Sequence, residues 1–321
     1  MIQTNKHFFL WSIAIVALLI LCWLSLITGV KDIRISEVLS DADQLLFLLI
    51  SRVPRTLALV LVGAGMSIAG FILQQLSQNR FVSPTTSGSL EAAKMGVLVA
   101  LIFFPTASLF LRMLFSMIFC FGISLLFILF ISKVKLRSTV FIPLIGLMFG
   151  SILSAAATFF AYKHGIVQNT QEWLLGDFSA VLAGQYEAIY LILPAVILIY
   201  FYAEKITIVG MGESFAKNLG LSYQQVLYIG LFTVSLVVSA SMVTVGAIPF
   251  IGLIIPNFIS IYFGDNLKRT LPITAFAGAI FLLICDIIGR LLVFPFEIPI
   301  GMIVGIIGGI LFLVLIVRRD S

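Results

Sequence analysis

Charged side chains are rare in this sequence, so their spacing is informative. Only 10% of the residues are charged, yet Asp286 and Arg290 stand four positions apart inside a long apolar stretch. On a helix, an acid four residues before a base is well placed to form an ion pair. If the stretch crosses a bilayer, a lone charge within it costs about 2.5–3.5 kcal/mol on insertion scales. We therefore expect Asp286 and Arg290 to form an intramembrane ion pair that faces protein or water rather than lipid.

Arg52 and Arg55 form a second group of charges, in the sequence Ser51-Arg-Val-Pro-Arg55. Pro54 suits the first turn of a helix, where its missing N–H costs nothing, and arginines three positions apart project to similar sides of a helix start. Two interpretations are open. The side chains can snorkel to a membrane interface, or they can be docking points for carboxylates of an external partner. Arg290 lies toward the same end of its segment and could join them.

Residues 203–225 form the longest polar interruption in the second half of the chain. Gly212 breaks the preceding segment, and Glu213 suits the positive N-terminus of a helix. Phe215, Ala216 and Leu219 then share one helical face, and Gly220 stands where a C-terminal cap belongs. The pattern predicts a short, capped helix, which is typical of a docking element rather than of a slack linker.

Several catalytic and metal-binding patterns are missing from the sequence. There is no G-x-x-x-x-G-K-[ST] motif, so the chain has no phosphate-cradling loop of that kind. The two histidines, His7 and His164, stand far apart, and no His, Cys and carboxylate cluster has the spacing of a metal site. No Ser–His–Asp set is suggested. Cys22, Cys120 and Cys285 lie in separate apolar runs and are expected to be packing residues. We expect neither an enzyme nor a bound metal.

The composition indicates that these residues are held by membrane-spanning helices. The 321 residues are 61% hydrophobic, with a mean hydropathy of +1.19, a balance that few soluble domains tolerate. Runs of about 20 apolar residues are long enough to cross a bilayer as helices. We predict an all-α, polytopic membrane protein that forms a single domain over residues 1–321.

Ten apolar segments are expected to be its transmembrane helices. They cover roughly residues 8–30, 56–76, 88–104, 113–132, 139–162, 188–203, 226–248, 250–263, 271–292 and 299–317. The first is interpreted as a retained span rather than a signal peptide. The sixth and eighth are short, and the eighth, with Pro249, Gly252, Pro256 and Gly264, is expected to be a broken crossing that other protein shields.

Ten crossings place both termini on the same side of the membrane. If residues 203–225 are cytoplasmic, eleven basic residues lie inside and seven outside, with Lys94 ambiguous. The inside set is Lys6, Arg80, Lys133, Lys135, Arg137, Lys205, Lys217, Lys268, Arg269, Arg318 and Arg319, and the outside set is Lys31, Arg34, Arg52, Arg55, Arg112, Lys163 and Arg290. This positive-inside bias predicts cytoplasmic termini. The net charge of +5 is therefore interpreted as an orientation signal, not as a sign of nucleic-acid binding.

Two further patterns have more than one interpretation. Gly146 and Gly150, like Gly301 and Gly305, are four positions apart, a spacing that lets helices approach closely within one chain or between two copies. Ser138 precedes the fifth apolar segment and is a candidate helix N-cap.

Eight short motifs follow one another along the chain. They are Arg52-Val-Pro-Arg55, Val62-Gly-Ala-Gly-Met-Ser-Ile-Ala-Gly70, Gln74-Gln-Leu-Ser-Gln-Asn-Arg80, Trp173-Leu-Leu-Gly-Asp-Phe-Ser179, Gly212-Glu-Ser-Phe-Ala-Lys-Asn-Leu-Gly-Leu221, Gly246-Ala-Ile-Pro-Phe-Ile-Gly-Leu-Ile-Ile-Pro-Asn257, Asp286-Ile-Ile-Gly-Arg290 and Glu297-Ile-Pro-Ile-Gly301. Each motif alone is weak, but the ordered set spans almost the whole chain. It resembles the FecCD-type permeases, which are the membrane subunits of type II ABC importers for ferric siderophores, haem and cobalamin.

The resemblance implies a set of partners. These are a second permease subunit, identical or paralogous, with the pathway at the dimer interface, two cytoplasmic ABC ATPase subunits and an external substrate-binding protein or lipoprotein. Residues 212–221 would be the coupling helix that sits in a cleft of the ATPase, with Gly212, Glu213, Ser214, Ala216, Leu219 and Gly220 as its coupling residues. Arg52, Arg55 and Arg290 would pair with glutamates of the binding protein, and Ser138 and Thr139 would belong to a cytoplasmic gate. The chain itself would bind no cofactor, since ATP and Mg²⁺ would be held by the ATPase.

Two segments depart from the family pattern. Asn79-Arg-Phe-Val-Ser-Pro-Thr-Thr86 stands where many members read N-P-L-A-D-P, and Ile255-Pro-Asn257 stands where many read V-P-H. Both variants resemble a subgroup that serves petrobactin, anguibactin and other catechol-containing siderophores. The resemblance therefore implies import of a ferric catecholate-type siderophore across the bacterial cytoplasmic membrane, and it disfavours cobalamin and haem.

An ion-coupled secondary transporter of a small organic solute is the alternative from a different class. Such transporters usually carry inverted repeats and membrane-embedded ionisable groups. No repeat is evident in the sequence, and only Asp286 lies clearly inside an expected span. Dependence of uptake on ATP rather than on an ion gradient separates the two classes.

Overall fold

The protein is described by a computed structural model that covers residues 2–29, 42–133, 141–168, 173 and 175–319. Within these residues the chain is helical, apart from loops and one isolated antiparallel bridge between Val293 and Phe296. The longer helices are α1 (Ile2–Ile27), α3 (Val53–Leu76), α4 (Ser89–Phe103), α5 (Leu109–Lys133), α6 (Phe141–Lys163), α8 (Ile192–Gly210), α10 (Tyr223–Thr244), α11 (Ile251–Phe263), α12 (Leu267–Leu291) and α13 (Ile300–Arg319). The short elements are α2 (Ala42–Phe47), one π-helical turn η1 (Leu48–Arg52), one 3-10 turn η2 (Glu187–Leu191) and α9 (Glu213–Asn218).

Each of the ten predicted apolar segments coincides, in order, with one of these longer helices. Among the described residues, six continuous helical stretches are long and apolar enough to cross a membrane: Ala42–Leu76, Leu109–Lys133, Phe141–Lys163, Glu187–Gly210, Tyr223–Thr244 and Leu267–Leu291. Shorter apolar helices cover Ser12–Ile27, Ile251–Phe263 and Ile300–Leu315.

The sixth segment is longer than predicted, and the polar interruption after it is correspondingly shorter. α8 continues beyond Ala203 to Gly210. The charged residues in this last part of α8 have partners. Glu204 forms an ion pair with Lys268, whose Nζ lies 2.6 Å away, and Lys205 Nζ lies 4.7 Å from the centroid of the Tyr202 ring. The first half of the polar interruption predicted over residues 203–225 is therefore helical, and the helix ends at Gly210, just before the break predicted at Gly212.

α11 and α4, with 13 and 15 residues, are shorter than the roughly 20 residues that a full crossing needs. The predicted short eighth segment is confirmed as the 13-residue helix α11, and the third segment, predicted over residues 88–104, is the 15-residue helix α4. Gly88 and Phe250 precede them with left-handed φ values of 77° and 61°. The loop before α4 satisfies its polar groups locally, as where the Phe81 N–H donates to Asn79 Oδ1 at 2.8 Å. This is the condition under which irregular backbone is tolerated at membrane depth.

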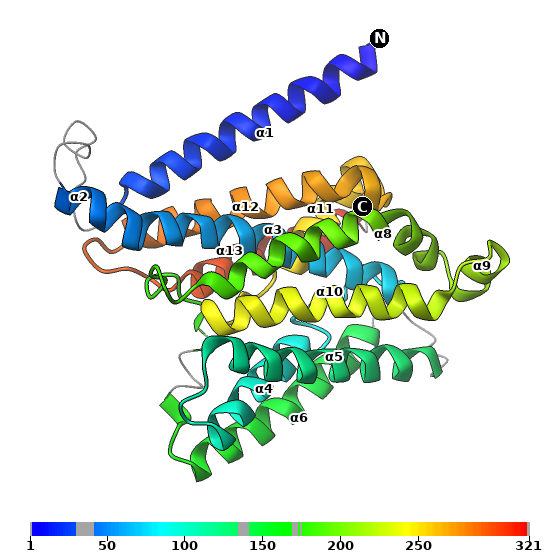
Figure 1. Cartoon of the computed structure of the whole chain (residues 1–321). Helices are drawn as coiled ribbons and strands as arrows, with labels where there is room; N and C mark the ends of the chain where they lie inside the picture. The colour runs from blue at the N-terminus through cyan, green and yellow to red at the C-terminus, as the bar shows by residue number, and fades with distance from the viewer. Residues whose placement is uncertain (1, 30–41, 134–140, 169–172, 174, 320–321) are drawn as a thin grey trace.

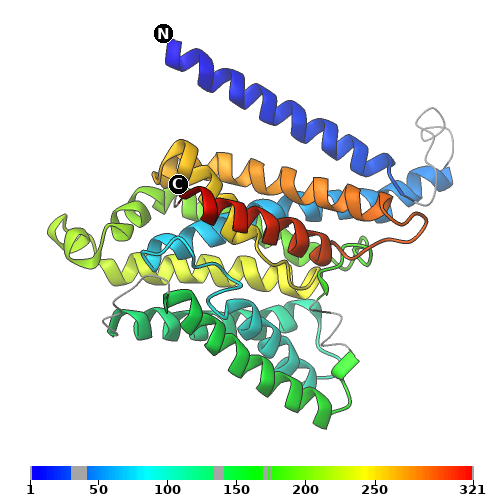
Figure 2. The same cartoon turned by 180° about the vertical axis from the view of Figure 1, so that it is seen from behind.

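α3 and α10 form the centre of the bundle (Figures 1 and 2). In the apolar windows of their spans 78% and 72% of residues are buried, against 28% in α5 and 22% in α6. Glycines let α3 approach its neighbours: a Cβ on Gly63 would lie 2.5 Å from the Gly278 carbonyl oxygen of α12, and one on Gly70 would lie 1.8 Å from the Gly252 carbonyl oxygen of α11. Gly63 and Gly70, in the middle and second half of α3, are thus intramolecular packing positions.

The peripheral helices expose large apolar side chains. α1 leaves the bundle at an angle in both views, and its Val16, Leu19 and Trp23 are exposed (Figures 1 and 2). α6 likewise exposes Ile152 and Phe159. Apolar side chains on the outside of long helices have lipid as their natural surroundings. The chain is a multi-pass membrane protein.

The bundle has two functionally distinct ends. Both termini and α9 lie at one end, at the right of Figure 1 and the left of Figure 2. We call this the α9 end. The opposite end carries the start of α3 and the C-terminus of α12, with Arg52, Arg55 and Arg290, and we call it the arginine end.

Candidate functional site

At the α9 end, the connection between α8 and α10 contains the predicted capped helix. Gly212 precedes α9 with φ 119°, and Glu213 is its first residue. At the other end Gly220 has φ 75°, its N–H donates to the Lys217 carbonyl at 2.9 Å, and the Leu221 N–H donates to the Ala216 carbonyl at 3.0 Å. These two bonds form a Schellman motif, which fixes where the helix ends.

α9 presents an apolar surface to the outside. Ala216 is fully buried against α8 and α10, whereas Phe215 and Leu219 are 45% and 56% exposed. The three residues predicted to share one face are therefore divided: Ala216 anchors the helix and the two larger side chains remain uncovered. Ser214 is exposed, and Glu213 forms an exposed ion pair with Lys217 at 2.7 Å. An apolar pair on a rigid, solvent-facing helix is a surface that a partner protein can bury.

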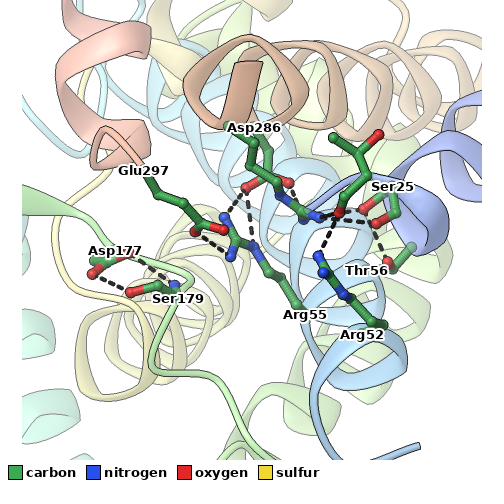
Figure 3. A network of polar contacts seen from close by, with 10 residues as sticks. Ser25, Arg52, Arg55, Thr56, Asp177, Ser179, Asp286 and Glu297 are labelled. Atoms are coloured by element: carbon green, nitrogen blue, oxygen red, sulfur yellow. Dashed lines mark hydrogen bonds and ion pairs between the residues drawn. The ribbon is translucent and has the colours of Figure 1, made fainter. Parts of the chain in front are cut away.

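At the arginine end, Arg55 joins two helices and a loop (Figure 3). Its Nη2 lies 2.8 Å from Asp286 Oδ1 on α12, and its Nη1 lies 2.6 Å from Glu297 Oε2 in the loop before α13. The Asp286 side chain is 1% exposed and that of Glu297 24% exposed. Asp286 is thus the buried carboxylate partner of Arg55, and Glu297 is the accessible one.

Arg290 and Arg52 bind the C-terminus of α1. Arg290 Nη1 donates to the carbonyls of Ser25 at 2.9 Å and Thr28 at 2.8 Å, while its Nη2 pairs with Asp286. Arg52 donates to the same Thr28 carbonyl. The last carbonyls of a helix lack partners within it, and the negative end of its dipole favours cations. Two arginines therefore cap α1 and hold it against α3 and α12.

The predictions for this network are partly confirmed. Asp286 and Arg290 form the expected ion pair, it is buried in protein, and Arg290 does join Arg52 and Arg55. Arg52 and Arg290 do not project outward, however: they are 5% and 2% exposed. Their hydrogen bonds to α1 provide the reason, because a guanidinium that reaches helix-end carbonyls is drawn into the bundle.

Sequence reasoning assigned no role to Ser25, Thr28 or Glu297. The role of Glu297 could have been suspected from the sequence. It is the only acidic residue between Asp286 and Asp320, and no carboxylate partner had been predicted for Arg55 within the chain. The roles of Ser25 and Thr28 had no such signal. Arg290 reaches the backbone carbonyls of both, which any residue provides, and the Ser25 hydroxyl adds one acceptor at 3.3 Å. Gly29 matters as well: a Cβ there would lie 1.9 Å from Arg52 Nη1, so only glycine allows this approach.

Three of the ordered motifs meet beside this network. The Ala247 N–H donates to the Trp173 carbonyl at 2.8 Å, and the Gly301 N–H donates to the Gly176 carbonyl at 3.0 Å. Gly176 has φ 60° and its missing side chain lets the Ala247 carbonyl approach. Asp177 caps the following turn by accepting from the Ser179 N–H at 2.8 Å (Figure 3). These motifs are therefore backbone junctions between loops and α13.

The two departures from the family pattern contact each other near the α9 end. Asn257 Nδ2 donates to the Arg80 carbonyl at 2.8 Å, and Arg80 Nη2 lies 2.6 Å from Asp265 Oδ2. Phe81 packs edge-on against Phe312 of α13, with ring centroids 6.1 Å apart. The two departing segments are therefore neighbours in the fold.

The remaining residues singled out in the sequence are the paired glycines, Ser138, Thr139 and the cysteines. Gly146 and Gly150 pack on the loop before α4, and Gly301 packs on Leu175, whereas a Cβ on Gly305 would contact nothing within 4 Å. Ser138 and Thr139 lie outside the described residues. Over the residues that the structure describes, the three cysteines are free and no group of three His, Cys, Asp or Glu side chains could hold a metal.

Comparisons with known proteins agree with this architecture. The chain is 48% identical over 307 residues to the petrobactin import system permease protein YclN of Bacillus subtilis, covering 95% of this chain and 97% of that protein. It is 46% identical over 305 residues to the ferric-anguibactin transport system permease protein FatD of Vibrio anguillarum, covering 95% and 97%. A solved inward-facing structure assigned to the metal-chelate type of ABC transporters superposes with a TM-score of 0.80 at 26% identity, over 95% of this chain and 97% of that one.

PsaBC from Streptococcus pneumoniae, solved in complex with Fab, shares the fold with a TM-score of 0.58 at 17% identity, over 88% of this chain and 93% of that one. The sequence model of the FecCD transport family matches residues 17–318. Since this match spans nearly the whole chain, the protein belongs to the FecCD transport family.

Proposed function

We propose that this chain is the membrane-spanning permease subunit of an ATP-binding-cassette importer that carries a ferric catecholate-type siderophore into the cell. The observation that carries the proposal is α9: a short helix that starts after Gly212, ends in a Schellman motif and leaves Phe215 and Leu219 uncovered. A separate ATPase, which holds ATP and Mg²⁺, binds this surface. The α9 end and both termini accordingly lie in the cytoplasm.

The packing of α9 gives a route for transmission into the bundle. Ala216 is buried where α9 contacts α8 and α10, and α10 in turn packs against α3, α4 and α5. The Schellman motif at Gly220 keeps α9 from unwinding when it is pushed. Movement of the ATPase is therefore passed to α10 as a rigid displacement rather than absorbed by a flexible loop.

The arginine end is proposed as the outer docking surface for a substrate-binding protein. Of the three arginines, Arg55 is the one whose partner Glu297 is accessible. A carboxylate of the docked protein competes with Glu297 for Arg55, while Asp286 keeps the guanidinium in place. Arg52 and Arg290 act through the position of α1, since each donates a hydrogen bond from Nη1 to the Thr28 carbonyl at its C-terminal end.

The substrate class rests on the relatives and on the segments that depart from the family pattern. Proteins similar to this chain over 95% of its length are named for import of petrobactin and ferric anguibactin. The chain carries the cargo as an intact ferric chelate, so it needs no metal ligands of its own. A second permease subunit completes the pathway.

Substitutions in α9 test the proposal. The Phe215→Ala and Leu219→Ala variants each remove an exposed apolar contact, and we expect each to weaken binding of the ATPase about tenfold, the effect of about 1.4 kcal/mol at an interface. Lys217→Ala is the matched control on the same helix, because its exposed ion pair contributes little. ATPase binding is measured in detergent and siderophore uptake in proteoliposomes. Wild-type binding by both apolar variants would contradict the coupling role.

A further inference from the structure

A buried lysine within the membrane region has no role in the transmission described so far. The Lys94 side chain on α4 is 3% exposed, and its Nζ lies 2.5 Å from Glu91 Oε2 on the same helix. Nζ also lies 3.2 Å from Ser154 Oγ on α6. The Glu91 side chain is 26% exposed, so the carboxylate, not the ammonium, is the accessible part of this ion pair.

The ion pair lies near the middle of the bilayer. Nine residues separate Lys94 from Phe103 at the outer end of α4, and nine separate Ser154 from Lys163 at the outer end of α6. At 1.5 Å per residue both positions are about 14 Å from those ends, close to half of the roughly 30 Å hydrocarbon thickness. The two helices place their polar groups at the same depth.

A partly exposed carboxylate at that depth cannot face lipid. Ionised side chains inside a membrane face protein or a water-filled cavity because transfer to hydrocarbon is costly. Glu91 Cγ lies close to Gly150 of α6, where a Cβ would be 3.5 Å away. The carboxylate therefore opens at the seam between α4 and α6, on the side of the molecule remote from α1 (Figure 1).

The surface of α6 beside this seam carries hydroxyl groups as well as the exposed Leu144 and Leu147. Ser151, Ser154 and Thr158 follow each other at spacings of three and four, so they lie along one face, and Ser151 and Thr158 are exposed. A neighbouring face carries Met148 and Ile152, which are exposed and apolar. One helix thus presents a hydroxyl stripe next to Glu91 and an apolar stripe away from it, as expected of a helix between water and lipid or protein.

We propose that Glu91, held by Lys94 and flanked by Ser151 and Thr158, is a binding station on the water-filled translocation path for protonated amines or other hydrogen-bond donors of the transported chelate. The open oxygen of an ionised carboxylate only accepts hydrogen bonds, so its ligand must donate. Lys94 pairs with Glu91 and orients its carboxylate, but it is too buried to bind cargo itself. The inference rests on the proposed transport function, since it requires a path through the protein.

Thiol labelling of the assembled transporter in membrane vesicles tests the proposal independently of transport. In a background without Cys22, Cys120 and Cys285, we introduce Ser151→Cys on the hydroxyl stripe and, as the matched control, Ile152→Cys on the apolar stripe. The probes are a cationic and an anionic membrane-impermeant methanethiosulfonate. We expect Ser151→Cys to react about tenfold faster than Ile152→Cys, and faster with the cationic probe, because nearby charge concentrates its counterion. Adding Glu91→Gln should abolish the preference for the cation.

Equal rates at the two positions, or a preference that survives Glu91→Gln, would overturn the proposal. A lack of reaction at Ser151→Cys would also overturn it and would show that a second subunit or lipid covers the seam. Uptake provides a second measurement. Glu91→Gln should raise the KM for an amine-bearing ferric chelate but not for an amine-free one, and Glu91→Asp should restore it. If uptake proves independent of ATP while the labelling result holds, the importer proposal fails and the station remains.

Discussion

The buried network at the arginine end predicts a large effect of removing Asp286. This carboxylate is 2% exposed and is shared by Arg55 and Arg290. In the Asp286→Ala variant Arg55 retains Glu297, but Arg290 retains only hydroxyl and carbonyl oxygens of α1. Leaving one charge of a buried pair uncompensated costs about 3–5 kcal/mol. At about 2 °C per kcal/mol for a protein of this size class, the apparent melting temperature should fall by about 6–10 °C.

The assay is thermal denaturation of the detergent-solubilised chain, followed by loss of the monodisperse chromatographic peak. Glu204→Gln is the control, because it breaks an exposed ion pair with Lys268 that contributes about 0–1 kcal/mol. Adding Arg290→Met to Asp286→Ala removes the unpaired cation and should recover part of the loss. If Asp286→Ala melts at the temperature of the control, the network is not the buried electrostatic unit described here.

Three further predictions follow from individual contacts. Gly70→Ala should destabilise the protein severely, because the added Cβ would overlap the Gly252 carbonyl of α11. In the control Gly122→Ala the added Cβ meets nothing within 4 Å, so this variant should be neutral or stabilising by up to about 1 kcal/mol. Equal melting temperatures of the two variants would refute the packing argument. Arg290→Lys should loosen the C-terminus of α1, because an ammonium lacks the fork that reaches the Ser25 and Thr28 carbonyls together; faster hydrogen exchange over residues 22–29 checks this, and unchanged exchange would remove the capping role. Glu297→Gln should strengthen docking of the binding protein by freeing Arg55 from its accessible partner, most clearly at low salt; unchanged affinity in a binding assay would argue against docking on Arg55.

The fold was largely predictable because its signals are local. A bilayer requires long apolar helices, so the ten segments could be located from the apolar runs along the sequence. Gly212 and Gly220 likewise delimit α9 by their backbone requirements, and the structure gives both residues positive φ. The boundary at residue 203 was wrong because Glu204 and Lys205 are satisfied by Lys268 and Tyr202, which a one-dimensional pattern does not reveal.

The site was only partly predictable because its decisive contacts are long-range. The pairing of Asp286 with Arg290 follows from helical spacing, but Arg55 reaches Glu297 across 242 positions and Arg290 reaches Ser25 across 265. Backbone acceptors carry no sequence signal at all. The contact between Asn257 and the Arg80 carbonyl is another long-range example. Each of the two segments that depart from the family pattern could be identified in the sequence, but their contact in the fold could not be predicted.

The central claim, that this chain is one subunit of an ATP-driven importer, is tested most directly by its partners. The tagged chain is purified in gentle detergent from iron-starved cells, and all co-purifying proteins are identified. We expect an ATPase with a phosphate-binding loop, recovered in smaller amount with Leu219→Ala and in full amount with Lys217→Ala. A second permease-like chain would indicate a heterodimer, and its absence a homodimer. Purification of the chain without any ATPase, with uptake that collapses on loss of an ion gradient, would contradict the account and favour a secondary transporter.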